Sequence, residues 1–148
     1  MTINKTINIA SAIITDALGR CLLVRKRGTS HFIQPGGKIE PGEQPAVALS
    51  RELYEELGLR TEAAQFSYVG KFTDVAVNEP GREVVAEIYY LSTERSDFQP
   101  AAEIEEIYWY SPDDSRHVLL APLTENHLLP LVKTLSNSAQ RPETPAVH

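Results

Sequence analysis

Three glutamates lie close together near the middle of the chain, at positions 52, 55 and 56. On a helix, Glu55 and Glu56 would lie about 60° and about 40° to either side of Glu52, so the three carboxylates would share one stripe. Two such charges ~4 Å apart repel by ~1 kcal/mol in water and by ~4 kcal/mol at an effective dielectric constant of about 20. A divalent cation would convert this repulsion into attraction, and carboxylate oxygens suit Mg²⁺ or Mn²⁺. These residues alone leave a solvated acidic helix face as the alternative.

The segment that carries the glutamates has the pattern of a helix over residues 43–57. Ala46, Leu49, Leu53 and Leu57 recur on one face, and Gly58 provides a stop signal. Residues 28–42 are rich in glycine and proline, which predicts a structured loop before the helix, with short strands around residues 32–33 and 38–39.

Arg51 lies where it could organise this region. It precedes Glu55 by four residues, a spacing that allows an ion pair on a helix. It could equally reach back to Glu43 and join the loop to the helix. In either case a carboxylate at Glu43 suits the positive end of the helix dipole.

Together these residues match the signature of the Nudix hydrolases, and the chain resembles that family at every position of it. The signature is Gly, five residues, Glu, seven residues, Arg-Glu, an aliphatic residue, any residue, Glu-Glu, any residue, Gly and an aliphatic residue. It is carried by Gly37, Glu43, Arg51, Glu52, Leu53, Glu55, Glu56, Gly58 and Leu59. The match covers 23 of the 148 residues, and the rest of the chain agrees with the family in layout.

The resemblance implies an α/β fold, a Nudix-type α/β/α sandwich with a mixed central sheet and a catalytic loop-helix-loop. It also implies Mg²⁺-dependent hydrolysis of a nucleoside diphosphate linked to another group, with Mn²⁺ as the alternative cation. The implied metal ligands are three carboxylates and one backbone carbonyl: Glu52, Glu55, Glu56 and Gly36. Arg51 and Glu43 would organise them, and Gly37 and Lys38 of the loop would contact the substrate.

A general base would take a proton from the attacking water. Relatives often provide this base from outside the signature helix, and the candidates here are Glu103, Glu105 and Glu106. We favour Glu106, with Glu56 as the alternative base and solvated surface charge as the alternative role for all three.

Further substrate contacts are expected outside the signature. Arg25 and Arg27 alternate along a strand and therefore share one face, where they could meet phosphates or form a charged strand end. Asn126 stands near the start of the last predicted helix. The resemblance to the branch that cleaves 8-oxo-dGTP gives it a purine-reading role, and a helix cap is the alternative.

The remaining elements fit one domain over residues 1–136. Strands are predicted over residues 7–17, 20–27, 65–76, 83–92 and 105–110, a turn or short helix starts at residues 111–114, and a second helix spans 123–136 with a kink at Pro130. Residues 137–148 are polar and contain prolines, so we expect a flexible tail.

Composition narrows the set of partners. The chain has 14 basic and 20 acidic residues, a net charge of −6, which disfavours binding to nucleic acid. Cys21 is the single cysteine, so no internal disulfide can form. No apolar run approaches the ~20 residues of a membrane span. We therefore expect a cytoplasmic protein with a small nucleotide as substrate, either a monomer or a homodimer.

Three functional hypotheses follow. The first is hydrolysis of a normal or modified nucleoside triphosphate to the monophosphate and pyrophosphate. The second is a pyrophosphatase for nucleoside-diphosphate sugars or ADP-ribose, which often carries an additional N-terminal domain; the first predicted strand begins by residue 7, so we favour the first hypothesis. The third is a nucleotide-sensing module without catalysis, which would commonly have lost signature glutamates that this chain retains. Processing of messenger-RNA caps or 5′ ends is a further alternative that the same helix could serve, but the net negative charge argues against binding long RNA.

Overall fold

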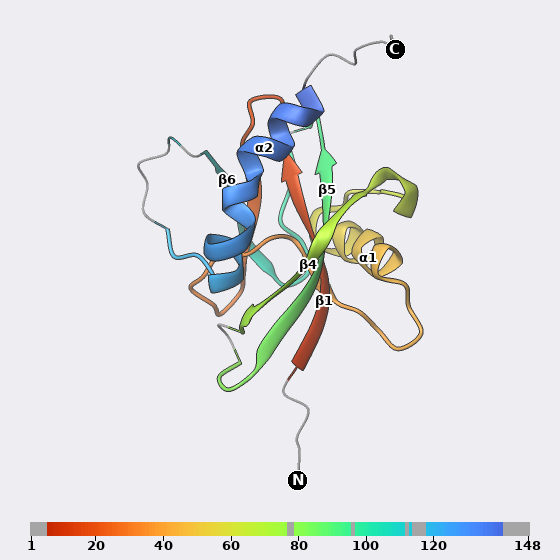
Figure 1. Ribbon diagram of the computed structural model, residues 1–148, viewed down its shortest axis with the longest axis vertical. Coiled ribbons are helices and arrows are strands. Elements are labelled where there is room, and N and C mark those ends of the chain that lie inside the picture. The colour runs from red at the N-terminus through yellow and green to blue at the C-terminus, as the bar shows by residue number, and fades with distance from the viewer. Residues whose placement is uncertain (1–5, 77–78, 96, 112, 114–117, 141–148) are drawn as a thin grey trace.

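A mixed β-sheet runs through the molecule and separates two helices (Figure 1). The computed structural model describes residues 6–76, 79–95, 97–111, 113 and 118–140. Its strands are β1 (Thr6–Thr15), β2 (Cys21–Lys26), β3 (Gly36–Lys38), β4 (Ser67–Val75), β5 (Glu83–Ser92) and β6 (Ile104–Tyr110). Its helices are α1 (Pro45–Leu57) and α2 (Leu129–Gln140). A 3₁₀ turn (Ala63–Gln65) precedes β4, and a π-helical turn (Thr124–Leu128) leads into α2.

The sheet has the order β4-β5-β1-β2-β6, and β3 also pairs with β1. β1 and β5 are parallel over their full lengths, from Thr6 opposite Glu83 to Thr15 opposite Ser92. The other strand pairs are antiparallel. The expected α/β fold class, with a mixed central sheet between helices, is confirmed.

Alternating side chains on the central strands build two apolar layers, one on each face of the sheet. Leu22 and Val24 of β2 pack with α1, in a layer that also contains Leu49 and Leu53. The intervening Leu23 faces the opposite side and packs with the C-terminal helix. Each face of the sheet is therefore covered by one helix, and the direction of a strand side chain decides which helix it meets.

Helix α1 forms as its sequence pattern predicts. Its buried apolar side chains recur at helical spacing: Ala48, Leu49, Leu53 and Leu57. Gly58 ends the helix with φ +69°, a left-handed conformation that glycine adopts without penalty, and its N–H donates to the carbonyl of Tyr54 at 2.9 Å. The carboxylates of the signature are thereby held on a rigid element.

The C-terminal helix differs from its prediction in two ways. Residues 124–128 form a π-helical turn instead of α-helix, immediately before Pro130, which has no N–H to donate to the carbonyl four residues earlier. The helix also continues to Gln140, beyond the expected end at residue 136. Residues 141–148 of the expected tail, and most of the turn expected from residue 111, lie outside the described residues. Among the described residues, no helix has both the length and the apolar character to cross a membrane.

Candidate active site

Glu56 is a carboxyl group inside the protein. It is 1% exposed, and its Oε1 accepts a hydrogen bond from the Gly36 N–H at 3.1 Å. Its Oε2 is buried with no hydrogen-bond partner among the described residues. Burial raises the pKa of Glu56 to about 8, although the Gly36 N–H acts to lower it. A cation beside Oε2 would supply the missing partner.

The two glycines that begin β3, Gly36 and Gly37, leave room for this carboxyl cluster. A Cβ on Gly36 would lie 2.2 Å from the Ala10 carbonyl oxygen, and its φ of +143° also favours glycine. A Cβ on Gly37 would lie 2.5 Å from the Glu52 carboxyl carbon. Gly36 thus permits close packing on β1, and Gly37 leaves space for Glu52.

Arg51 connects the loop to the helix and contacts both of the partners that its position allows, Glu43 and Glu55. Its Nε and Nη2 donate to the two carboxylate oxygens of Glu43 at 3.0 and 2.9 Å, and Nη2 also donates to the Lys38 carbonyl at 3.2 Å. Nη1 donates to Glu52 at 3.0 Å and lies 3.6 Å from Glu55. The Arg51 guanidinium holds the pKa of Glu43 down to about 2. Arg51 and Glu43 therefore organise the cluster from both sides.

The donor set suits a hard divalent cation. Glu52, Glu55 and Glu56 offer carboxylate oxygens only, which fit Mg²⁺ or Mn²⁺. Arg51 holds two of these carboxylates, and in the described part of the chain no three acidic, histidine or cysteine side chains converge on one metal position. The unpartnered oxygen of Glu56 and the partial burial of Glu52, which raises its pKa, are both features that a bound cation would relieve.

The end of β2 brings a further ion pair to the cluster. Lys26 follows Leu22 and Val24 on the face of the sheet that α1 covers, and its Nζ lies 3.0 Å from the Glu103 carboxylate. Burial, the Gly36 N–H and Glu52 have the largest effects on the pKa of Glu56. Of the remaining groups, Lys26 lowers this pKa and Glu103 raises it. Glu103 and Lys26 thus lie close enough to Glu56 to act on it electrostatically.

Glu106, the favoured base, is placed differently. It lies opposite Arg25, and the Arg25 Nε is 3.2 Å from its carboxylate. Arg25 follows Leu23 on the face away from α1, because successive strand residues alternate and Lys26 takes the other face. This placement disfavours Glu106 as the base, since the sheet separates it from the carboxylates of α1.

The two arginines expected to contact substrate are engaged with β6 and the adjoining loop. Arg25 pairs with Glu106 and donates to the Thr29 carbonyl at 2.8 Å, and the exposed Arg27 pairs with Glu105 at 3.2 Å. Neither lines a described pocket. The basic residue between them, Lys26, lines the pocket beside the glutamates. The predicted strand over residues 20–27 ends at Lys26, so Arg27 lies in the turn that follows and strand alternation does not place it beside Arg25.

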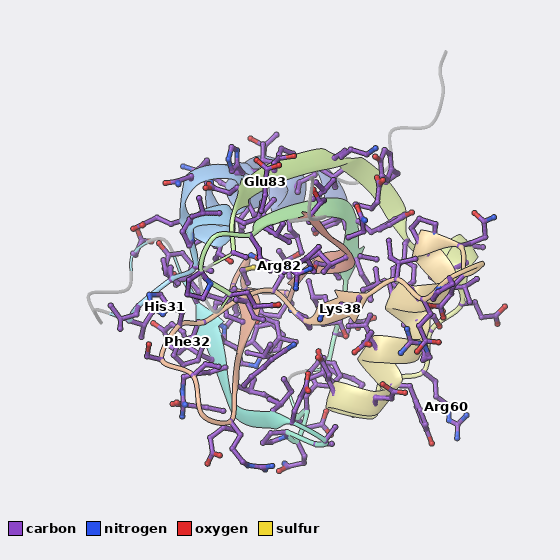
Figure 2. All side chains as sticks on the ribbon, turned by 90° about the horizontal axis from the view of Figure 1, so that it is seen from below. His31, Phe32, Lys38, Arg60, Arg82 and Glu83 are labelled. Carbon is purple, nitrogen blue, oxygen red and sulfur yellow. The ribbon has the colours of Figure 1, made fainter. Side chains whose placement is uncertain are left out.

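A pocket of about 150 Å³ opens beside the carboxyl cluster. Gly36, Gly37 and Lys38 line it, and the substrate contacts of Gly37 and Lys38 stay a prediction. Its other walls are mostly apolar: Ile7, Ile9, Ile33, Val75, Val84 and Leu123. Lys38 and Arg82 lie near each other (Figure 2) and both line a second hollow. The pocket therefore combines mostly apolar walls with three charged side chains, those of Lys26, Lys38 and Glu79.

Two pocket residues were not singled out from the sequence. Gln34 and Thr124 line the pocket and are hydrogen-bonded to each other, although they are 90 residues apart in the chain. Gln34 precedes Pro35 in the loop with no local pattern that marks it as buried. Only a search for polar residues just before the glycine pair would have found it.

Asn126 does not cap the C-terminal helix, and its purine-reading role stays a prediction. Its Nδ2 donates to Asp74 of β4 at 3.1 Å, and the same carboxylate oxygen lies 3.2 Å from His127. It makes no helix-capping hydrogen bond that the structure records and is absent from the pocket lining. Asn126 therefore joins the start of the C-terminal helix to the sheet near the pocket rim.

Comparisons with known proteins agree with this arrangement. A family model for the NUDIX domain matches residues 5–132. The CTP pyrophosphohydrolase of Escherichia coli is 32% identical over 126 residues, which cover 80% of this chain and 85% of that protein. The match covers 66% of a MutT-like protein from Streptomyces ambofaciens, at 26% identity, and 57% of an 8-oxo-dGTP diphosphatase from Haemophilus influenzae, at 38% identity. The chain thus spans less than two thirds of these last two relatives.

Solved structures show the same fold. The E. coli ORF135 protein superimposes with a TM-score of 0.64 at 28% identity, and covers 95% of this chain and 96% of its own. The MutT protein of Methanosarcina mazei superimposes with a TM-score of 0.72 at 20% identity, over 95% of this chain and 100% of its own.

Proposed function

The chain belongs to the Nudix family, and from this premise we propose that it is an Mg²⁺-dependent pyrophosphohydrolase of nucleotides. Its substrate is a normal or modified nucleoside triphosphate, which it cleaves to the monophosphate and pyrophosphate. The observation that carries this proposal is the continuity of the apolar pocket with Gly36 and Gly37, against which the carboxyls of Glu52 and Glu56 lie. A nucleobase in the pocket would leave its phosphates beside the carboxyl cluster.

Each charged residue has a distinct part in the reaction. A divalent cation held by Glu52, Glu55 and Glu56 would neutralise phosphate oxygens and lower the pKa of a bound water. Lys26 and Lys38 line the pocket and add positive charge beside the phosphates. Their ammonium groups offset the chain's net negative charge where the substrate enters.

We assign the proton transfer to Glu103 instead of Glu106. The oxygen of a water molecule forms a bond to phosphorus, the bridging P–O bond breaks, and pyrophosphate leaves. The proton of that water passes to the Glu103 carboxylate. Glu103 lies beside Lys26, on the side of the sheet that carries the glutamates, whereas Glu106 faces away. Such a base contributes typically ~10²–10⁴-fold to the rate.

The size of the pocket supports a nucleotide with one base. Its volume of about 150 Å³ is below the ~300–1,000 Å³ of pockets that enclose whole drug-sized ligands, so it admits one flat ring system and leaves the rest of the molecule at the mouth. Relatives named as a CTP pyrophosphohydrolase and an 8-oxo-dGTP diphosphatase act on nucleoside triphosphates, which favours this class. ADP-ribose and nucleoside-diphosphate sugars are the competing substrates.

The test is a substrate panel with purified protein and Mg²⁺. The panel contains common and oxidised nucleoside triphosphates, ADP-ribose, NADH, nucleoside-diphosphate sugars and dinucleoside polyphosphates, with products identified by mass spectrometry. We expect a nucleoside monophosphate and pyrophosphate, and a loss of at least about two orders of magnitude in Glu55→Gln and Glu56→Gln. Glu94→Gln, an exposed glutamate outside the site, is the matched control and should retain full activity.

Each other outcome has a definite meaning. Preferential cleavage of ADP-ribose or a sugar nucleotide would move the substrate to the second hypothesis. Tight binding of a nucleotide with no turnover at any Mg²⁺ or Mn²⁺ concentration would indicate a nucleotide-sensing module and refute the proposed enzyme activity.

A further inference from the structure

The side-chain amide of Gln34 is buried, and only one of its two polar atoms has a hydrogen-bond partner among the described residues. Gln34 is 3% exposed and Thr124 is 1% exposed, and the Thr124 hydroxyl donates to Gln34 Oε1 at 2.8 Å. Gln34 Nε2, which carries two N–H donors, has no hydrogen-bond partner among the described residues. An unpaired buried donor is costly and calls for an explanation, and a ligand that accepts from it is one.

The amide of Gln34 lies beside the apolar pocket. Both Gln34 and Thr124 line it, between the wall formed by Ile33 and Leu123 and the glycine pair. Most of the remaining lining is aliphatic, which suits the faces of a planar ring but offers its edge few hydrogen bonds. The amide of Gln34 is therefore a specific polar contact for a ring that enters the pocket.

The surrounding backbone fixes the amide in place. On one side of Gln34, Ile33 exchanges two backbone hydrogen bonds of 2.8 Å with Val24 of β2. On the other side, the Pro35 carbonyl accepts from the Ala12 N–H of β1 at 3.0 Å. Since Gln34 is also buried and bonded to Thr124, little side-chain freedom remains to be lost when a ligand binds.

The C-terminal helix is held against the same loop. Phe32 donates to the carbonyl of Leu119 and accepts from the N–H of Ala121, at 2.8 and 3.1 Å. Thr124 begins the π-helical turn that follows, a feature often found at functional sites. The turn directs Thr124 inward to Gln34, while Asn126 bonds to Asp74 outside the pocket.

We propose that Gln34, held by Thr124, is the residue that selects the nucleobase, and that it favours a base edge with carbonyl acceptors over adenine. Because Thr124 bonds to Oε1, Nε2 is the atom of this amide that is left to donate to a base bound beside it. Guanine offers adjacent O6 and N7 acceptors and pyrimidines offer carbonyl oxygens, whereas adenine places an amino donor beside N7. This inference rests on the proposed function, since it names the base that the same site takes.

The experiment compares GTP, CTP, UTP and ATP as substrates of wild type, Gln34→Leu and Thr124→Val. We expect wild type to prefer the carbonyl-bearing bases. In Gln34→Leu, kcat/KM for the preferred bases should fall by roughly 5–100-fold while that for ATP changes by less than about threefold, so the preference collapses. Thr124→Val leaves Gln34 in place but frees Oε1, and should reduce the preference by admitting adenine. Thermal unfolding of both variants checks that they remain folded.

A second measurement separates this inference from the proposed function. Binding of the four nucleoside monophosphates in EDTA, measured by titration calorimetry, requires neither metal nor turnover. The same loss of preference in Gln34→Leu supports the inference even if wild type hydrolyses none of the triphosphates, an outcome that would overturn only the proposed function. The inference is overturned if both variants keep the wild-type base ranking, if all four nucleotides weaken equally, or if wild type prefers adenine.

Discussion

Replacement of Glu56 by glutamine should stabilise the metal-free protein while it abolishes activity. The pKa of Glu56 is about 8 in the folded protein and 4.5 for the ordinary side chain, because burial disfavours the charged form. Between pH 4.5 and 8 the folded state therefore retains a proton that the unfolded state has released. The free energy of unfolding of the wild type falls as pH rises through this window and levels off above it.

The size of the effect follows from the same two values. Each pH unit inside the window corresponds to ~1.4 kcal/mol, so ionisation of Glu56 costs ~3 kcal/mol of stability at pH 7 and ~5 kcal/mol above pH 8. Glutamine is uncharged and its Oε1 can still accept the Gly36 N–H bond that Glu56 accepts at 3.1 Å. The Glu56→Gln variant should therefore match the wild type near pH 4 and exceed it by ~3 kcal/mol at pH 7.

Urea unfolding in EDTA at pH 4, 5, 6, 7 and 8 measures this difference. Glu94→Gln removes an exposed carboxylate and should stay within ~0.5 kcal/mol of the wild type at every pH. Addition of Mg²⁺ should stabilise the wild type more than Glu56→Gln, because the metal binds the ionised carboxylate. A difference that is absent at pH 7, or that is constant from pH 4 to 8, would refute the reasoning that Glu56 is a desolvated, uncompensated carboxyl.

Three further predictions concern the loop, the base and the core. Gly37→Ala places a methyl group against the Glu52 carboxylate, a proposed metal ligand, and should lower kcat/KM by about 10–100-fold with little loss of stability. Gly42→Ala, at φ +80° with open space around its Cβ, should cost ~1 kcal/mol of stability and leave activity unchanged. Equal activities of the two variants would contradict this. Glu103→Gln should lower kcat by ~10²–10⁴-fold in a steady-state assay and Glu106→Gln by far less, and the reverse order would restore the original choice of base. Burial raises the pKa of Cys21 to about 12, so thiol reagents at pH 8 should label it only after urea unfolding, and rapid labelling of native protein would show that this part of the core opens.

The sequence was sufficient for the elements whose signals are local. Helix α1 was expected over residues 43–57 and spans Pro45–Leu57, because apolar spacing and Gly58 both mark it within one segment. The strand of residues 83–92 was predicted with its observed bounds, since alternation and flanking turn residues are also local. The C-terminal π turn was missed because Pro130 signals an interruption without specifying its geometry.

The carboxyl cluster was also readable from the sequence, since helical spacing alone brings Glu52, Glu55 and Glu56 to one stripe. The environment of this cluster could not be predicted from the sequence. Spacing cannot give the burial of Glu56 or the simultaneous contacts of Arg51 with Glu43 and Glu52, because these depend on how the loop packs on the helix.

Tertiary structure decided which side chains join that cluster. Alternation along β2 separates Arg25 from Lys26, but only the packing of α1 on the sheet determines that Lys26 and Glu103 lie on the side of the glutamates. Likewise, no local pattern links Gln34 to Thr124, which meet across 90 residues of chain. Sequence periodicity fixes which residues share a face, whereas the choice of face and the partners across it arise from non-local packing, which a single strand or helix does not encode.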